Sequence, residues 1–270
     1  MAQNALKPWE QLTITDNYLF QLVMHRKHLC KQLIKKILQI KIRDIAYPDY
    51  EKTLLADPLK KSIRLDVYVE DVEGRVYDIE MQCTNPGEEE LGTRARYYQS
   101  IIDSELLEKG ASYKELNTSY VILICTFDPF NRGRALYKFR NTCEDEGDAI
   151  ELKNREYKLF LNSKGYSEAK EPDLADFLQY IDGKSAEREF AREVADAVRE
   201  LQRSPTERRN YMLLSQILKE EQKASFEQGV RHTALAMLKN GISIDMIQQC
   251  TGLSKEELNV LQTAGPIEEK

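Results

Sequence analysis

Apolar residues recur at three- and four-residue spacing near the start of the chain and alternate with polar residues further along. Residues 16–40 have the helical spacing, with basic side chains mainly between the apolar ones, so they predict one amphipathic helix. Residues 63–70 and 76–82 alternate strictly, which is typical of strands with one buried face. The unbroken apolar run at 119–126 predicts a strand that is buried on both faces.

The two alternating segments are expected to form one hairpin. Between them lies the sequence DVEGR, in which Gly74 is suited to the left-handed position that ends a three-residue loop. With residues 72–74 as the loop, opposed residues have numbers that sum to 146. This register places Asp66 opposite Glu80, with Gln82 on the same face of the hairpin.

Two opposed carboxylates make this face of the hairpin a candidate metal site. Directly opposed side chains have Cβ atoms about 4.5–5.5 Å apart, and carboxylates at that distance repel each other unless a cation lies between them. Mg²⁺ and Mn²⁺ prefer such oxygen ligands. Alternation by itself favours a different interpretation, in which the acids lie on a solvated outer face. A shift of one residue in register would also separate Asp66 from Glu80.

The second half of the chain is predicted to be mainly helical. A helix over 88–110 is expected to end at Gly110, and helices follow from residue 173, with a new one starting near Pro205. Three short helices are expected near the C-terminus, over 227–239, 243–250 and 255–262.

The layout of these last helices is similar to a helix-turn-helix. Ser254 and Glu257 have the spacing of a capping box at the start of the final helix. That helix begins with acidic residues, which suits phosphate contact poorly. An interaction or dimerisation module therefore stands as an equal alternative to a DNA reader.

Composition and charge narrow the functional classes. The chain has 270 residues and a formal net charge of −6, and residues 62–183 carry 15 basic and 25 acidic side chains. This balance excludes a protein that binds nucleic-acid phosphates through an overall positive charge. It still permits nucleic-acid binding through a local basic surface. Five cysteines without a Cys-x-x-Cys pair argue against a disulfide framework or an ordinary zinc site. No phosphate-binding loop, long apolar run or signal sequence is present, so we expect no nucleotide cofactor, no membrane association and a cytoplasmic location.

Several sequence blocks resemble one protein family. The pattern RLDVYVEDVEGRVYDIEMQ, followed by RARYYQS, resembles the Rpn family of recombination-promoting nucleases, also described as transposases, in the PD-(D/E)XK superfamily. The segments TDNYLFQLVM, LEKGASYKELNTSYVILICTF and EQGVRHTALAMLKNGISIDMIQQCTGLSKEEL resemble further blocks of that family. The resemblance implies an α/β fold with a restriction-endonuclease-like core, a mixed sheet flanked by helices and an α-helical C-terminal extension. It implies a nuclease domain over 1–183 and a helical region over 184–270 with a helix-turn-helix-like end.

The resemblance also implies a set of site residues. Asp66 and Glu80 would bind the metal, and Gln82 would complete the catalytic face at the position where the superfamily usually has lysine. A glutamine side chain can only form hydrogen bonds there. Asp16 would add a third carboxylate to the metal site or, alternatively, cap the first helix. Arg94 and Tyr98 match the family's Arg-x-x-x-Tyr and would bind a phosphate or order the site, with an ordinary salt bridge and a packed ring as the alternative.

These assignments lead to an expected function. The resemblance implies a DNA endonuclease that uses Mg²⁺ or Mn²⁺ and is linked to DNA recombination, mobile elements or phage defence. The charged helices over 184–231 favour a homodimer. Alternatives are a catalytically weak or inactive DNA-binding or interaction protein that keeps the fold, and a helical-bundle interaction protein without the 63–82 hairpin. Four lysines of the first helix are candidate contacts to the DNA backbone, unless they merely form a solvated face: Lys27, Lys31, Lys35 and Lys36.

Overall fold

A computed structural model of the protein describes residues 7–47, 66–107, 110–143 and 150–263. The chain divides into two compact units, one formed by residues 7–204 and one that contains the helices from Pro205 onwards. The boundary expected between residues 183 and 184 stays a prediction, and the packing of the first unit continues to Ser204.

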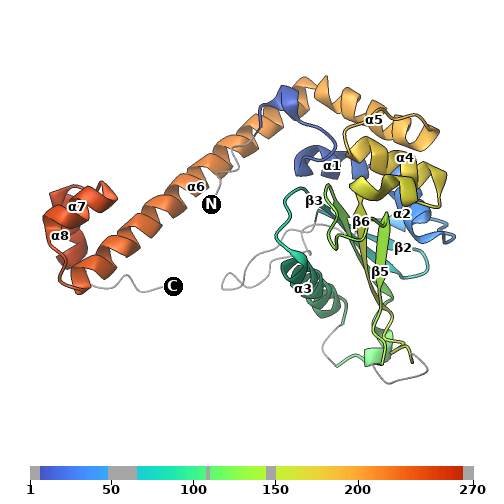
Figure 1. The fold of residues 1–270 in the computed structure, drawn as a ribbon, viewed down its shortest axis with the longest axis horizontal. Coiled ribbons are helices and arrows are strands. Elements are labelled where there is room, and N and C mark those ends of the chain that lie inside the picture. The colour runs from blue at the N-terminus through green and yellow to red at the C-terminus, as the bar shows by residue number, and fades with distance from the viewer. Residues whose placement is uncertain (1–6, 48–65, 108–109, 144–149, 264–270) are drawn as a thin grey trace. The chain divides into compact units, whose positions relative to one another are not determined.

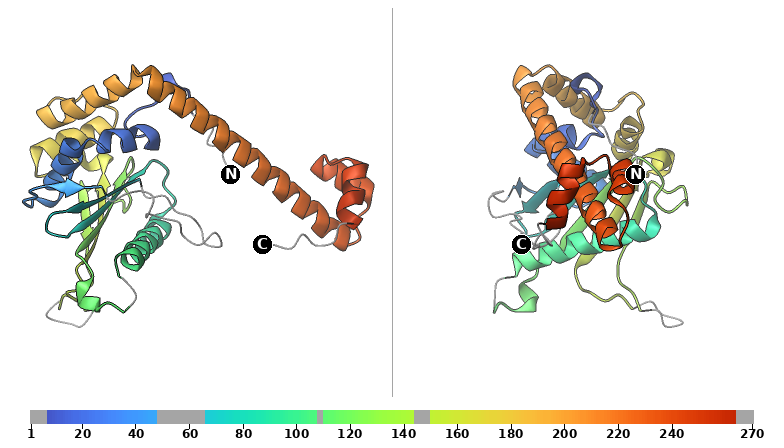
Figure 2. Two further views of the ribbon diagram at one scale, coloured as in Figure 1. Left: turned by 180° about the vertical axis from the view of Figure 1, so that it is seen from behind. Right: turned by 90° about the vertical axis from the view of Figure 1, so that its left-hand side faces the viewer.

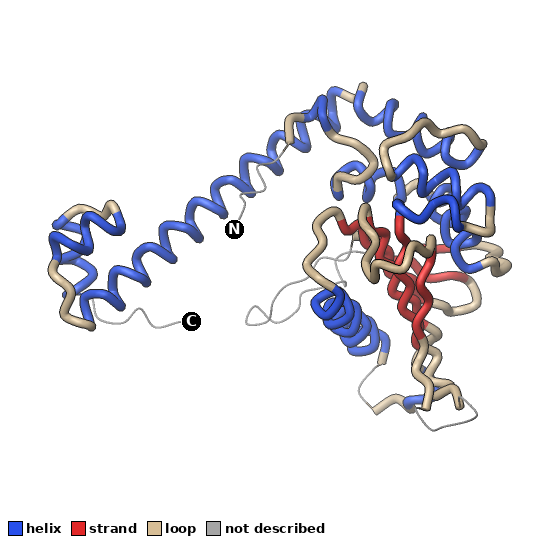
Figure 3. Tube along the Cα trace, in the orientation of Figure 1, coloured by secondary structure: helices blue, strands red, loops and turns tan. Residues whose placement is uncertain are grey.

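The first unit is built around a six-stranded mixed sheet, drawn in red in Figure 3. The strand order is β1-β2-β3-β4-β6-β5. The three central strands β3, β4 and β6 run parallel to one another, and the strands outside them pair antiparallel. The strands are β1 (Ile45–Ala46), β2 (Val67–Asp71), β3 (Val76–Gln82), β4 (Ser119–Cys125), β5 (Leu136–Phe139) and β6 (Glu156–Asn162).

Helices cover both faces of this sheet, as Figures 1 and 2 show. Helix α3 lies on one face, and α1, α2, α4 and α5 group on the other side. This architecture confirms the predicted α/β fold, a mixed sheet flanked by helices. The helices of this unit are η1 (Trp9–Gln11), α1 (Asn17–Met24), α2 (Lys27–Leu38), α3 (Glu88–Leu106), η2 (Tyr113–Glu115), η3 (Ser163–Glu168), α4 (Pro172–Ile181) and α5 (Glu189–Gln202).

The hairpin of β2 and β3 has the predicted register. Val67 lies opposite Ile79, which is the pairing that sums to 146. The loop closes where expected, because the N–H of Asp71 donates to the carbonyl of Arg75 at 2.9 Å. Gly74 has a φ of 77°, in the left-handed region that this turn requires. The first part of the predicted strand, residues 63–65, lies outside the described residues.

Residues 16–40 form two helices, so the single predicted helix is wrong. The break falls at His25 and Arg26, where the backbone of Arg26 is extended. In one continuous helix, Arg26 and Lys27 would follow Val23 by three and four residues and enter the buried stripe. The break leaves both cations free to form surface ion pairs, since burying them would cost free energy.

Other elements agree with the sequence pattern to different degrees. Every residue of β4 is buried, which confirms the strand predicted at 119–126. Helix α3 ends at Leu106 rather than at Gly110. Strands β5 and β6 were not predicted, because they interleave charged and aromatic residues without strict alternation.

The C-terminal unit consists of three helices with a small core of their own. Helix α6 (Pro205–Lys239) starts at the predicted proline and runs for 35 residues, so the separate helix predicted over 227–239 is its last part. Helices α7 (Ile244–Thr251) and α8 (Lys255–Thr263) pack on it around Ala234, Ile247 and Leu258. The Ser254–Glu257 capping box is confirmed by hydrogen bonds in both directions. Among the described helices, none is long and apolar enough to cross a membrane.

Close packing at Gly165 gives a first testable prediction. A Cβ atom added at this residue of η3 would lie 2.7 Å from the carbonyl oxygen of Arg134. We expect Gly165→Ala to lower the free energy of unfolding by about 1–3 kcal/mol, measured by urea denaturation. Gly92→Ala is the control, since a Cβ there meets no described atom within 4 Å and alanine favours a helix. Equal stability of the two variants would contradict the prediction.

Candidate active site

Asp66 and Glu80 meet on the face of the sheet that α3 covers. The backbone N–H of Asp66, one residue before β2, donates to Glu80 Oε1 at 2.8 Å. The exposed fractions of the two residues are 5% and 4%. The interpretation of this face as a solvated outer surface is therefore wrong. Its neighbours are apolar residues of the core, among them Tyr68, Leu123 and Tyr98.

Donors from two elements hold the carboxylate of Asp66. The N–H of Met81 donates to Oδ2 at 3.2 Å, and Gln21 Nε2 donates to Oδ1 at 2.9 Å. Asn17 Nδ2 lies 3.5 Å from the same Oδ1. Gln21 and Asn17 are one turn apart on α1, so the first helix orients this carboxylate. Neither amide was among the predicted site residues, although their spacing of four residues was a usable signal.

A third carboxyl group at this site, that of Asp78, was also missed. Asp78 is fully buried in β3, where no described backbone N–H or side-chain amide donates to its oxygens and its carboxyl interacts with that of Glu80. It lies on the same strand face as Glu80, and the alternation over 76–82 had already placed it there. A buried carboxyl without donors is costly when it is ionised.

Burial and mutual repulsion change the protonation of these acids in the metal-free protein. Burial, together with the charge of Asp66, raises the pKa of Glu80 to about 8. Burial, together with the charge of Glu80, raises the pKa of Asp78 well above its usual range. At neutral pH the site therefore retains protons that a bound cation would displace.

Arg94 connects α3 to the end of β3. Its guanidinium donates to Gln82 Oε1 at 2.9 Å and pairs with Glu90 Oε1 at 3.1 Å. Tyr98, one turn further along α3, is 6% exposed and packs in the core, and burial raises the pKa of its hydroxyl. The structure thus brings Arg94, Gln82 and Tyr98 to the same side of the hairpin as the carboxylates.

The carboxylate of Asp16 has its described contacts in the N-terminal segment. It accepts the N–H of Thr13 at 2.7 Å and pairs with Lys7 at 2.8 Å. Asp16 occupies the N-cap position of α1, and its backbone carbonyl accepts the N–H of Phe20 at 2.9 Å, but its side chain forms no capping hydrogen bond. Its charge contributes to the raised pKa of Cys83, for which burial is the larger cause. The thiol of Cys83, one residue after β3, donates to the carbonyl of Thr15 at 3.0 Å, so Asp16 lies near the end of β3.

Three of the four candidate lysines on α2 form contacts within the protein. Lys27 pairs with Asp44 at 2.7 Å, and Lys31 lies 4.0 Å from the same carboxylate. Lys36 pairs with Asp173 at 2.5 Å. Lys35 is exposed in the last turn of the helix. Contact with DNA would require the first three to exchange or share their carboxylate partners.

The carboxylate oxygens at the hairpin are ligands that suit a hard divalent cation. Asp66 and Glu80 offer adjacent carboxylates, and the buried carboxyl of Asp78 lies beside that of Glu80. Within the described ranges, no three Asp, Glu, His or Cys side chains are arranged as a metal site. Mg²⁺ typically binds through one or two carboxylates, water and substrate phosphates. The carboxylate pair therefore fits a cation whose remaining ligands come from solvent and substrate.

Comparison with known families gives two matches. The family described as PD-(D/E)XK nuclease family transposase matches residues 17–211. The family described as Rpn/YhgA-like nuclease family, C-terminal HTH domain, matches residues 232–263. No curated protein and no solved structure matches the chain significantly. The first match spans most of the chain, including the hairpin and α3, and the two together confirm the resemblance seen in the sequence.

Proposed function

The chain belongs to the PD-(D/E)XK nuclease family, and on this premise we propose that it is a divalent-metal-dependent endonuclease that hydrolyses phosphodiester bonds in DNA. One observation carries the proposal. The backbone N–H of Asp66 donates to Glu80 across a buried hairpin face, beside the fully buried carboxyl of Asp78 and next to a helix that contributes Arg94. A purely structural hairpin gains nothing from three acids in a buried position.

Each residue has a proposed part in the reaction. Asp66 and Glu80 would hold Mg²⁺ or Mn²⁺, which supplies Lewis-acid stabilisation of charge on the phosphate oxygens and lowers the pKa of water. Gln21 and the N–H of Met81 orient Asp66 for this task. Because Gln82 Oε1 accepts from Arg94, the amide N–H₂ group of Gln82 is the part that can donate to a water or phosphate.

The test of this function is cleavage of supercoiled plasmid by the purified full-length chain. We expect nicked product with Mg²⁺ or Mn²⁺ and none in excess EDTA. Cleavage that continues in EDTA would contradict metal dependence.

Arg94 is proposed as a positioning residue for Gln82. We expect Arg94→Ala to lower the cleavage rate by about 10- to 100-fold, because small misplacements of a catalytic group have effects of that size. Arg94→Lys should recover little, since lysine cannot reproduce the geometry of the guanidinium. The control is Glu90→Gln, which removes the exposed partner of Arg94 but keeps Gln82 Oε1 bonded. A rate for Arg94→Ala equal to that of the control would contradict this role.

A DNA-binding protein with weak or no cleavage is the second candidate. It is favoured by Gln82 at the usual lysine position and by the lack of a three-ligand cluster among the described residues. The C-terminal helix-turn-helix match supports DNA binding in either case. Gel-shift binding without metal-dependent nicking would select this candidate.

Two further proposals concern the biological role and the oligomeric state. We propose a role in recombination, mobile elements or phage defence, on the basis of the family membership. We propose a homodimer, on the basis of the charged helices over 184–231.

A further inference from the structure

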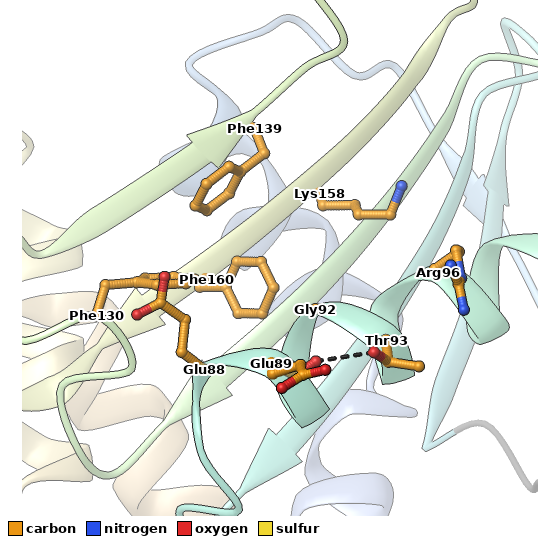
Figure 4. Close-up of a pocket in the computed structure, with 9 residues that line it drawn as sticks. All are labelled: Glu88, Glu89, Gly92, Thr93, Arg96, Phe130, Phe139, Lys158 and Phe160. Atoms are coloured by element: carbon orange, nitrogen blue, oxygen red, sulfur yellow. Dashed lines mark hydrogen bonds between the residues drawn. The ribbon is translucent and has the colours of Figure 1, made fainter.

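A pocket of about 400 Å³ lies between the first half of α3 and strands β5 and β6. Three phenylalanines form its aromatic wall (Figure 4). The ring centroid of Phe130 lies 5.0 Å from that of Phe139 and 5.1 Å from that of Phe160. Phe160 is 2% exposed and is fixed in the core, whereas Phe139 is 44% exposed. Phe139 is therefore the ring of this wall that a ligand can reach. The volume is in the range of about 300–1,000 Å³ that is usual for ligand sites.

The charged residues of the pocket are separated along α3. Glu88 and Glu89 lie in the first turn of the helix, whereas Arg96 lies about 11 Å further along at 1.5 Å per residue. Lys158 of β6 also lines the pocket, but its ammonium forms an ion pair with Glu156 of the same strand, and burial lowers its pKa. The pocket therefore has carboxylates at the start of α3, an aromatic wall, and the guanidinium of Arg96 as the cation that can meet a phosphate.

A nucleotide carries the complementary groups in one molecule. Its base has π-faces that stack on phenylalanine, its base edge has N–H donors that suit a carboxylate, and its phosphate suits a guanidinium or an ammonium. We propose that this phenylalanine pocket is a subsite for one unpaired base of single-stranded DNA. The proposal rests on the proposed function and defines its substrate class.

The position of α3 supports this assignment. Arg94 points to Gln82 in the candidate active site, and Arg96, two residues later and therefore on another side of the helix, lines the pocket. A helix with its side chains is about 10–12 Å across. A strand that crosses α3 would thus reach both places within a few nucleotides. A base within a duplex is stacked and cannot enter such a pocket, so the pocket selects unpaired DNA.

The test measures binding of a fluorescein-labelled 20-nucleotide single strand and of a matched 20-base-pair duplex to the full-length chain in EDTA. Loss of one stacking contact to a base weakens binding by about 5- to 150-fold. We therefore expect Phe139→Ala to weaken binding of the single strand by this factor. Binding of the duplex should weaken by less than about twofold. Phe139→Tyr should keep the affinity, because its ring still stacks. Tyr113→Ala is the control, since it removes another exposed ring outside the pocket.

A salt titration tests the cationic end of the pocket. Each phosphate contact to a single strand contributes about 0.7 to the slope of log K against log salt concentration. We therefore expect Arg96→Ala to reduce that slope by about 0.7 and Arg96→Lys to leave it unchanged.

Three results would overturn the proposal. One is an unchanged single-strand affinity of folded Phe139→Ala. Another is equal weakening of single-strand and duplex binding by that variant. If the plasmid assay is positive in either case, the pocket assignment alone fails and the nuclease function stands. The third is a wild-type chain that neither binds nor cleaves any DNA, which would remove both proposals.

Discussion

Replacing Asp66 by asparagine, or Glu80 by glutamine, is expected to lower metal-dependent plasmid cleavage by about 10³-fold or more. Removal of a metal ligand forfeits several kcal/mol of charge stabilisation, and each 1.36 kcal/mol is a factor of ten in rate. Both substitutions keep the size of the side chain and replace a carboxylate that would bind the metal by an amide. The measurement is the initial rate of nicking with Mg²⁺ and with Mn²⁺.

Two controls make this result specific. Glu70→Gln changes a carboxylate four residues from Asp66 on the same strand face, and cleavage should stay at the wild-type rate. Thermal unfolding and circular dichroism must show that each variant is folded, because Asp66 also accepts hydrogen bonds from Met81 and Gln21. Folded variants that cut as fast as the wild type would exclude the hairpin as the active site.

The metal-free protein is expected to lose stability as the pH rises from about 5 to 8.5. The pKa of Glu80 is raised to about 8, and that of Asp78 is also raised, from usual values near 4. Between the unfolded and folded pKa values the folded chain binds more protons than the unfolded chain, so the free energy of unfolding falls with increasing pH. The expected decrease is on the order of a few kcal/mol, measured by urea denaturation in EDTA.

Metal binding should reverse this loss. Mg²⁺ added at pH 8 is expected to raise the unfolding midpoint more than at pH 5, because the cation competes with protons for the same oxygens. Glu80→Gln has no proton to lose there, so its stability should depend less on pH and respond less to Mg²⁺. Identical pH profiles for this variant and the wild type would show that Glu80 titrates normally.

Local pattern was sufficient for the hairpin and for the central strand. Strict alternation, a glycine with the right position in the turn and a fixed loop length specify register, so the pairing of Asp66 with Glu80 followed from residue numbers alone. The continuous apolar run of β4 specified burial on both faces in the same way. The family assignment also needed only the sequence, because its blocks occur in order along the chain.

Alternation could not decide what covers the polar face of the hairpin. Only the packing of α3 showed that this face is buried. Because of that burial, the three acids are not surface residues, and the pKa values of Glu80 and Asp78 are raised. Likewise, Gln21 and Phe139 acquired their neighbours from segments distant in the chain. The periodicity of apolar and polar residues shows on which face of its own helix or strand a side chain lies. The burial of that side chain, its pKa and the shape of a pocket depend on which other helices and strands pack against that face.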